Sequence, residues 1–157
     1  DVRPAENVPE GKPLGDYSFG ENAMSYLVKM NELCKENGVE LILVKAPSLY
    51  PYWYDEWEEQ VEVFAKENDL KYYNFLKATD EIGLDFTEDT YDAGLHLNLS
   101  GAEKLSRYFG RILSEECGIE SRQGEAALEA QWDAKRQAYE ADRDAQYAEI
   151  GKNRNEE

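Results

Sequence analysis

The chain has 157 residues, of which 34 are acidic and 17 are basic, so its formal net charge is −17. A charge of this size and sign repels the phosphates of nucleic acids, which excludes them as partners, and it disfavours binding to anionic membrane surfaces. The longest continuous apolar run, Leu41–Val44, is far shorter than the roughly 18 residues of a membrane-spanning helix, so no transmembrane segment is expected.

The first part of the chain predicts a lead-in, a helix and a strand. Residues 1–17 are rich in proline and glycine and have no hydrophobic periodicity, which predicts an extended segment. Ser18 and Glu21 have the spacing of a capping box, and apolar residues then recur at helical spacing as far as Gly38. Residues 39–44 are β-branched or leucine with one acid, which predicts a buried strand.

A second helix and strand follow. Residues 55–68 carry an apolar face at helical spacing, with Asp55 and Glu58 as candidate caps of the helix start. Residues 70–75 are rich in aromatic side chains and predict a second strand. The pattern of helix, strand, helix, strand is typical of an α/β layer with a parallel sheet.

The last third predicts mostly helix. A short helix is expected within residues 76–84, a loop over 85–99, and a helix from the capping box at Ser100 to Gly118. From Gly124 the composition shifts to polar helix formers, which predicts a long helix laid across the domain rather than a coiled-coil partner. Its thin apolar stripe consists of Leu128, Trp132, Tyr139, Tyr147 and Ile150.

The chain therefore divides into a lead-in (1–17), an α/β portion (18–120) and a polar C-terminal helix (121–157). Two strands alone form a marginal sheet, so we expect further strands on sequence outside this chain. Cys34 and Cys117 allow a single disulfide, but two buried thiols are the favoured interpretation.

The chain's one histidine, His96, stands out because histidine is the residue type that most often acts as a general base near neutral pH. Asp92 lies four residues earlier, and a turn at Ala93 and Gly94 would bring its carboxylate onto the ring. A carboxylate in that place fixes the tautomer of a catalytic histidine and stabilises its charged form. The competing interpretation is a partly buried histidine that bonds to the backbone and shapes the loop.

At these residues the chain resembles a known family. His96-Leu97-Asn98 followed by Ser100-Gly101-Ala102 and an amphipathic helix is similar to the closing block of SGNH/GDSL hydrolases. The closest likeness is to membrane-anchored bacterial relatives of the DltD and AlgX kind, which act on cell-envelope polymers. The strand end Lys45–Ser48 also fits the family, and the resemblance covers residues 18–117.

The resemblance implies a flavodoxin-like three-layer α/β/α fold, incomplete in this chain, and a reaction without cofactor. A serine attacks an acyl carbonyl, and an aspartate and a histidine supply the acid and the base. It also implies an extracytoplasmic protein at the cell surface or anchored to a membrane. Two features depart from the family. Ala93 stands where the usual aspartate would be, one position after Asp92, and Gly15-Asp16-Tyr17-Ser18 makes a poor nucleophile block because of its inserted tyrosine.

We therefore expect the nucleophilic serine in an absent N-terminal part. The resulting hypothesis is a serine esterase or O-acyltransferase that acts on acyl groups of a cell-envelope glycan or a related substrate, with His96 as base and Asp92 as its acid partner. One alternative is a non-catalytic glycan-binding or assembly module that retains the fold. Another is an α/β interaction domain that docks through its long helix.

Residues 45–54 form a second candidate region, because α/β proteins bind ligands beyond the carboxyl ends of their strands and aromatic rings stack on sugars. The alternative is a packed loop that covers the sheet edge. The acidic loop over 85–92 matches no calcium-binding pattern, so no metal is expected. The predicted substrate-binding residues are Lys45, Ser48, Tyr52, Trp53 and Asn98.

Overall fold

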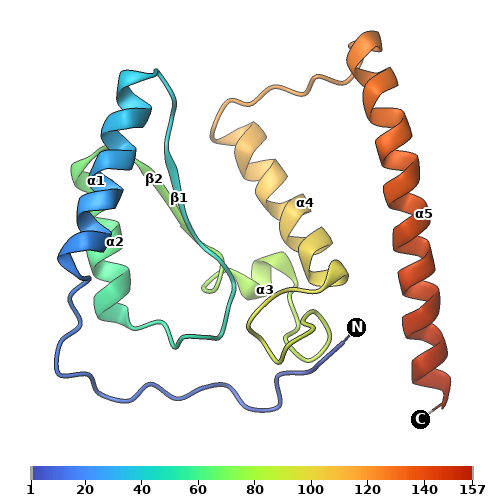
Figure 1. The fold of residues 1–157 in the computed structure, drawn as a ribbon, viewed down its shortest axis with the longest axis horizontal. Coiled ribbons are helices and arrows are strands. Elements are labelled where there is room, and N and C mark those ends of the chain that lie inside the picture. The colour runs from blue at the N-terminus through green and yellow to red at the C-terminus, as the bar shows by residue number, and fades with distance from the viewer. Residues whose placement is uncertain (1, 157) are drawn as a thin grey trace.

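A computed structural model describes residues 2–156, with side chains as far as residue 149. The protein is a mixed α/β structure, about half of it helical (Figure 1). The order of helices and strands that the sequence predicts is confirmed. The elements are α1 (Glu21–Glu36), β1 (Ile42–Lys45), α2 (Asp55–Glu67), β2 (Lys71–Asn74), α3 (Thr79–Ile82), α4 (Leu99–Glu115) and α5 (Ala126–Glu156).

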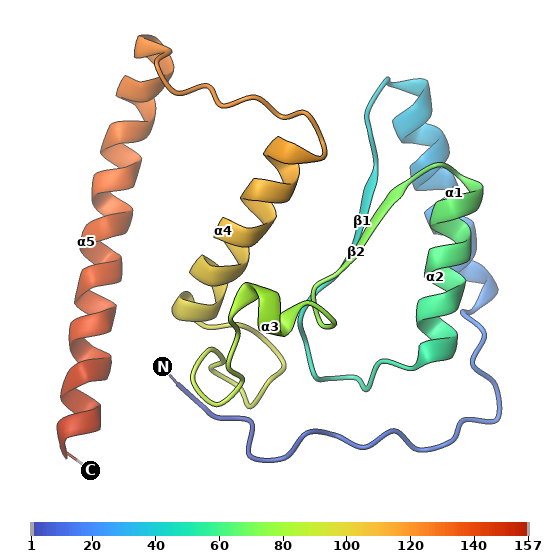
Figure 2. The same cartoon turned by 180° about the vertical axis from the view of Figure 1, so that it is seen from behind.

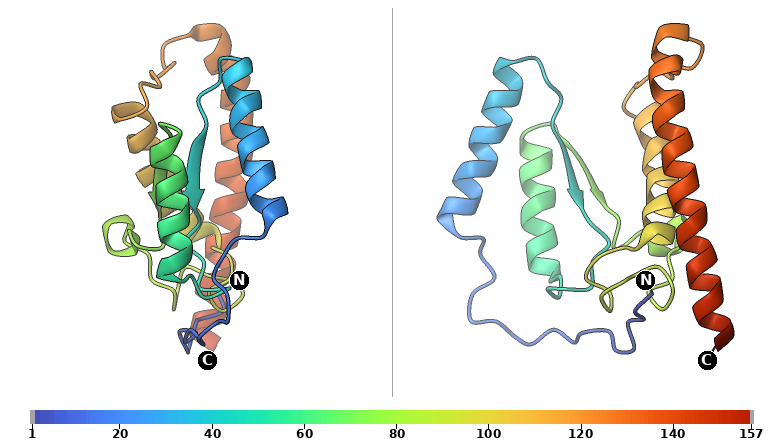
Figure 3. Two further views of the ribbon diagram at one scale, coloured as in Figure 1. Left: turned by 90° about the vertical axis from the view of Figure 1, so that its left-hand side faces the viewer. Right: turned by 45° about the vertical axis from the view of Figure 1, so that its right-hand side comes forward.

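The two strands form a parallel sheet, in which Ile42 lies opposite Lys71 and Lys45 lies opposite Asn74. Helices cover both faces of this sheet: α1 and α2 lie on one side, and α4 lies on the other, with α5 outside it (Figure 3). The described residues hold these two strands and no third one in the sheet. The lead-in runs below the carboxyl ends of the strands to the start of α1 (Figure 2).

The core lies between β2 and the helices α3 and α4. Phe75, Ile82 and Ile112 are buried together, and partly buried aromatic rings surround them. The rings of Phe75 and Phe109 meet edge to face with their centroids 5.2 Å apart, a favoured geometry for aromatic pairs. The apolar spacing of α4 thus anchors that helix on β2.

On the opposite face of β2, a buried carboxylate organises the packing. Glu58 is 4% exposed, and its Oε2 accepts hydrogen bonds of 2.7 Å from Trp53 Nε1, Tyr72 Oη and Asn74 Nδ2. Lys77 Nζ lies 3.2 Å from Oε1. Burial acts to raise the pKa of Glu58, but these donors outweigh it and hold that pKa below its usual value. Glu58 is therefore a packing centre, and its predicted capping role is wrong.

The other predicted caps of the first two helices are also wrong. Gly20 is the N-cap of α1 and makes no side-chain cap, while Ser18 Oγ donates to Asp16 at 2.6 Å. Tyr54 is the N-cap of α2, which places Asp55 inside the helix. At α1 the capping-box spacing is present, but the hydrogen bond to Asp16, two residues earlier, takes up the Ser18 hydroxyl.

Helix α5 confirms the predicted C-terminal helix, although it begins at Ala126 and runs beside α4 (Figures 1 and 3). Its contacts to α4 converge on one side chain: Tyr139 Oη and Tyr147 Oη donate to Glu103 at 3.1 and 3.3 Å, and Arg143 lies 3.9 Å from it. Ile150, the last residue of the predicted stripe, lies outside the described side chains. No helix in the described part of the chain is long and apolar enough to cross a membrane.

The two cysteines do not pair. Cys34 on α1 and Cys117 after α4 are both free thiols, and each is partly rather than fully buried. The expectation of free thiols is confirmed, while their expected full burial is wrong because both lie near the ends of their helices.

We expect Glu58→Ala to lower the free energy of unfolding by about 3 kcal/mol at pH 7, because three donors and one lysine lose their acceptor. Urea denaturation measures this, and the exposed neighbour variant Glu59→Ala serves as control. Since the folded-state pKa of Glu58 is depressed, its stabilising effect is present above an unfolded-state pKa of about 4.3 and disappears as the pH falls through the folded-state value. Equal effects of the two variants at pH 7 would contradict this role.

Candidate functional site

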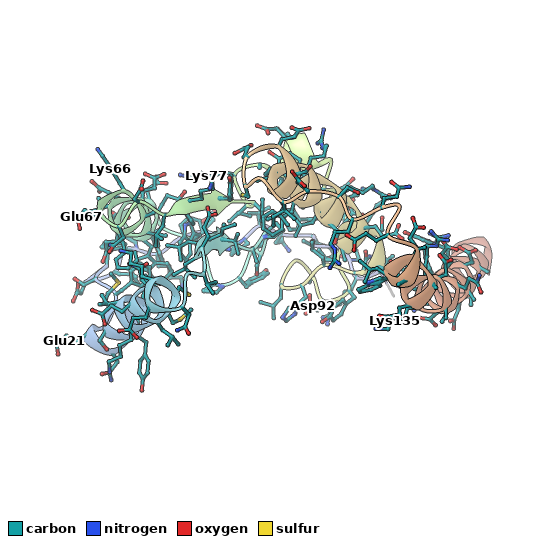
Figure 4. All side chains as sticks on the ribbon, turned by 90° about the horizontal axis from the view of Figure 1, so that it is seen from above. Glu21, Lys66, Glu67, Lys77, Asp92 and Lys135 are labelled. Carbon is teal, nitrogen blue, oxygen red and sulfur yellow. The ribbon has the colours of Figure 1, made fainter. Side chains whose placement is uncertain are left out.

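His96 belongs to the loop between α3 and α4. This loop lies beyond the carboxyl ends of the two strands (Figure 1). Its ring Nδ1 is 2.6 Å from Asp92 Oδ2, and its backbone N–H donates to Asp92 Oδ1 at 2.7 Å. Seen from above, Asp92 lies on this loop at the edge of the molecule (Figure 4). The structure thus brings together the two residues whose spacing suggested a contact.

A left-handed turn creates this contact. Ala93 has φ 61° and Gly94 has φ 97°, so two successive residues bend the chain back toward Asp92. Gly94 is also buried against Leu49: a Cβ at Gly94 would lie 2.7 Å from Leu49 Cδ1. The Leu49 N–H donates to the Gly94 carbonyl at 2.8 Å, which ties the loop of His96 to the segment that follows β1.

The electrostatic surroundings of Asp92 favour an ionised carboxylate paired with the imidazole of His96. Partial burial acts to raise the pKa of Asp92, but the hydrogen bonds from His96 outweigh it and hold that pKa below its ordinary value. The His96 side chain is 60% exposed and its ring stacks on Tyr91 at 5.8 Å. Among the described residues, Nε2 of His96 has no hydrogen-bond partner, so the ring turns one nitrogen to the carboxylate and the other to solvent.

The lead-in holds this loop from outside. Arg3 N–H donates to the Thr90 carbonyl at 2.9 Å, while Ala93 N–H and Thr90 Oγ1 donate to the Arg3 carbonyl at 3.1 and 2.7 Å. Ala5 N–H adds a bond to the Phe86 carbonyl. The predicted extended lead-in is thus part of the site, which the sequence could not indicate because Arg3 lies 87 residues from Thr90.

Asn98 is a buried residue that shapes the loop. It is the N-cap of α4, where its Oδ1 accepts from Gly101 N–H, so the predicted cap at Ser100 is wrong. Its Nδ2 donates to the carbonyls of Glu88 and Thr90 at 2.7 and 3.3 Å. These bonds tie the amide that was predicted to bind substrate into the loop itself.

Sequence reasoning missed a buried ion pair beneath the loop. Asp89 is almost fully buried, and its Oδ2 accepts from Lys104 Nζ at 2.6 Å and from Asp85 N–H at 2.8 Å. Gly101 packs closely here, since a Cβ at this position would lie 2.5 Å from the Asp89 carbonyl oxygen. No sequence spacing distinguishes Asp89 from the neighbouring acids of the loop.

The side chains of Lys45 and Ser48 form their hydrogen bonds within the segment that follows β1. Lys45 Nζ donates to the carbonyls of Ala46 and Ser48 at 2.6 and 3.3 Å, and it lies 5.2 Å from the ring centroid of Trp53. Burial lowers the pKa of Lys45, although the charge of Glu58 acts in the other direction. Ser48 Oγ donates to the carbonyl of Tyr50, which closes the loop on itself.

The aromatic residues form a packed cluster with partly exposed edges. Trp53 contacts Phe19 and Trp57, and its indole N–H is bound to Glu58. Tyr52 remains exposed at its outer edge and meets Tyr54 edge to face at 4.8 Å. The structure does not bring these residues onto His96; the Leu49–Gly94 hydrogen bond connects the two regions.

A shallow cavity of about 270 Å³ adjoins the His96 loop. Its wall combines the lead-in, the segment after β1 and the turn residue next to Asp92. This size lies just below that of typical small-molecule pockets. The lining residues are Arg3, Pro4, Ala5, Glu6, Asn7, Tyr50 and Ala93.

Among the described side chains, no group of three histidines, cysteines or acids is arranged to hold a metal ion. No family model matches the chain, and no curated protein or solved structure matches it either.

We expect Gly94→Ala to destabilise the protein by about 2 kcal/mol, because the left-handed backbone is strained for alanine and the new methyl group contacts Leu49. The control Gly110→Ala lies on an open face of α4 and should stabilise by about 0.5–1 kcal/mol. Thermal denaturation followed by circular dichroism compares the two. A neutral Gly94→Ala would show that this turn does not constrain the loop.

We expect His96→Ala to raise the pKa of the Asp92 carboxyl toward its ordinary value, because the ring hydrogen bond that lowers this pKa is removed. Carbon-detected NMR titration of the carboxyl resonances measures the change. The carboxyl of Asp85, which its bonds to Thr87 hold at a lowered pKa, should titrate identically in both proteins. An unchanged Asp92 titration would mean that the two side chains do not interact in solution.

Proposed function

We propose that this chain carries the acid–base part of an SGNH-type serine esterase or O-acyltransferase. The single observation that supports it is the 2.6 Å contact between Asp92 and an exposed His96 whose Nε2 points away from the carboxylate. A general base needs a second nitrogen that substrate-side groups can reach. The turn at Ala93 and Gly94 supplies this geometry although Asp92 is one residue further from His96 than in the family's usual spacing.

In the proposed reaction, His96 Nε2 accepts the proton of a serine hydroxyl as the serine oxygen attacks an acyl carbonyl. Asp92 holds the Nδ1 proton and stabilises the imidazolium that forms. The imidazolium then gives its proton to the departing alcohol, which leaves an acyl-serine. Water or an acceptor hydroxyl attacks that ester, with His96 again taking and returning the proton.

The serine belongs, in this proposal, to polypeptide that precedes residue 1. The sheet with helices on both faces is compatible with a larger, flavodoxin-like three-layer fold. The substrate would be an acyl group on a cell-envelope glycan or a related molecule, and the protein would work outside the cytoplasm or at a membrane surface. These assignments follow from the resemblance of the His96 segment to SGNH/GDSL hydrolases.

A second candidate function is glycan binding without catalysis. The exposed rings of Tyr50, which lines the lead-in cavity, and of Tyr52 favour it, because tyrosine rings offer flat apolar surfaces to sugars. The labelling experiment below separates the two functions, since a binding module contains no activated serine.

We expect fluorophosphonate labelling of the longer polypeptide to fall by a factor of about 10²–10⁴ in His96→Ala, the usual contribution of a general base. Asp92→Ala should reduce the rate less, because the imidazole remains. Asp85→Asn, which changes another carboxylate of the same loop, is the matched control and should label at the wild-type rate. Equal labelling of His96→Ala and wild type would rule out the base role, and no labelling of the wild type would favour the binding module.

A further inference from the structure

The sheet has a free edge at β1. β2 pairs with one side of β1, and no described residue pairs with the other side. Phe75 N–H donates to the Lys45 carbonyl at 3.0 Å, so the backbone groups of Lys45 face β2. Because successive residues of a strand direct these groups to alternate sides, the N–H and C=O groups of Ile42 and Val44 face the free edge.

The path of the chain indicates what belongs at this edge. Helix α2 carries the chain from β1 to β2, and α1 lies on the same face of the sheet as α2 (Figures 3 and 4). Connections between parallel strands are right-handed in nearly all proteins. The chain passes from α1 into β1 in the same way that it passes from α2 into β2. A strand that preceded α1 would therefore lie on the side of β1 that faces away from β2.

Helix α1 has a second apolar face that suits such a strand. Met24, Leu27, Asn31 and Cys34 form its partly or fully buried face, and Asn31 bonds to Asn68. Beside that face lies an exposed stripe at the spacing i, i+4, i+7: Tyr26 is 65% exposed, Met30 51% and Leu33 60%. Val44 of β1 is also half exposed: it lies on the face of the sheet that α4 covers at β2, and α4 does not reach as far as β1.

We propose that the free edge of β1 binds an apolar β-strand that runs parallel to β1, and that the stripe Tyr26, Met30 and Leu33 covers it. The strand comes from polypeptide upstream of the lead-in, an assignment that rests on the proposed function. The lead-in passes along the carboxyl ends of the strands, where a strand parallel to β1 would also end (Figure 2). A second copy fits less well, since each chain carries a net charge of −17 and a two-fold axis would pair β1 antiparallel to itself.

Amide hydrogen exchange tests the proposal. It is measured by NMR in residues 1–157 and in the longer polypeptide that includes the sequence encoded directly upstream. We expect the Ile42 and Val44 amides to exchange rapidly in the shorter chain and at least about 100-fold more slowly in the longer one. Equal exchange in both overturns the proposal. So does a gene without coding sequence upstream of Asp1, or a dimer of residues 1–157 that protects both amides.

Two variants give an independent readout. Leu33→Lys changes an exposed side chain in residues 1–157, so its melting temperature should stay unchanged there and fall by about 4–8 °C in the longer polypeptide. Ile119→Lys, an equally exposed apolar residue after α4, is the matched control and should be neutral in both. A neutral Leu33→Lys in the longer polypeptide contradicts the covered stripe. If the Ile42 and Val44 amides are protected in the longer polypeptide but fluorophosphonate does not label it, the result supports the added strand and rejects the esterase function.

Discussion

The hydrogen bond from Leu49 N–H to the Gly94 carbonyl joins the end of the sheet to the loop that carries Asp92 and His96. It forms because Gly94 has no side chain and adopts a left-handed conformation that places its carbonyl beside Leu49. The same turn brings Asp92 back onto His96. The close approach of the Gly94 backbone to Leu49 therefore determines the position of His96 relative to the strands. It also determines that Asp92 is the carboxylate that contacts the ring.

Around this contact, two buried carboxylates hold the neighbouring elements. Glu58 of α2 gathers donors from β2 and from the segment after β1, while Asp89 binds Lys104 beneath the loop. Glu58 Oε2 accepts three hydrogen bonds and Asp89 Oδ2 accepts two, which offset part of the cost of removing each carboxylate from water. The loop of His96 is thus fixed at its base by Asp89 and Asn98 and at its outer side by Arg3, and the ring itself stays accessible.

The sequence predicts the helices and strands well because their apolar periodicity is a local property that survives tertiary packing. It fails at the caps of α1 and α4, where Ser18 and Ser100 have the right spacing but Gly20 and Asn98 take the position. The contact between Asp92 and His96 was predictable because four residues and a glycine turn suffice to make it. The roles of Arg3 and Asp89 were not, because their partners are fixed by the tertiary fold rather than by neighbouring residues.

Helix α5 shows how unevenly stability is distributed along this chain. Tyr139, Arg143 and Tyr147 of α5 contact Glu103, a partly exposed carboxylate of α4, and exposed polar contacts of this kind contribute only about 0.2–1 kcal/mol each. An attachment of this kind opens more readily than a packed core. Because salt weakens exposed ionic contacts, we expect α5 to detach from α4 more readily as the ionic strength rises, while the sheet and the His96 loop stay folded.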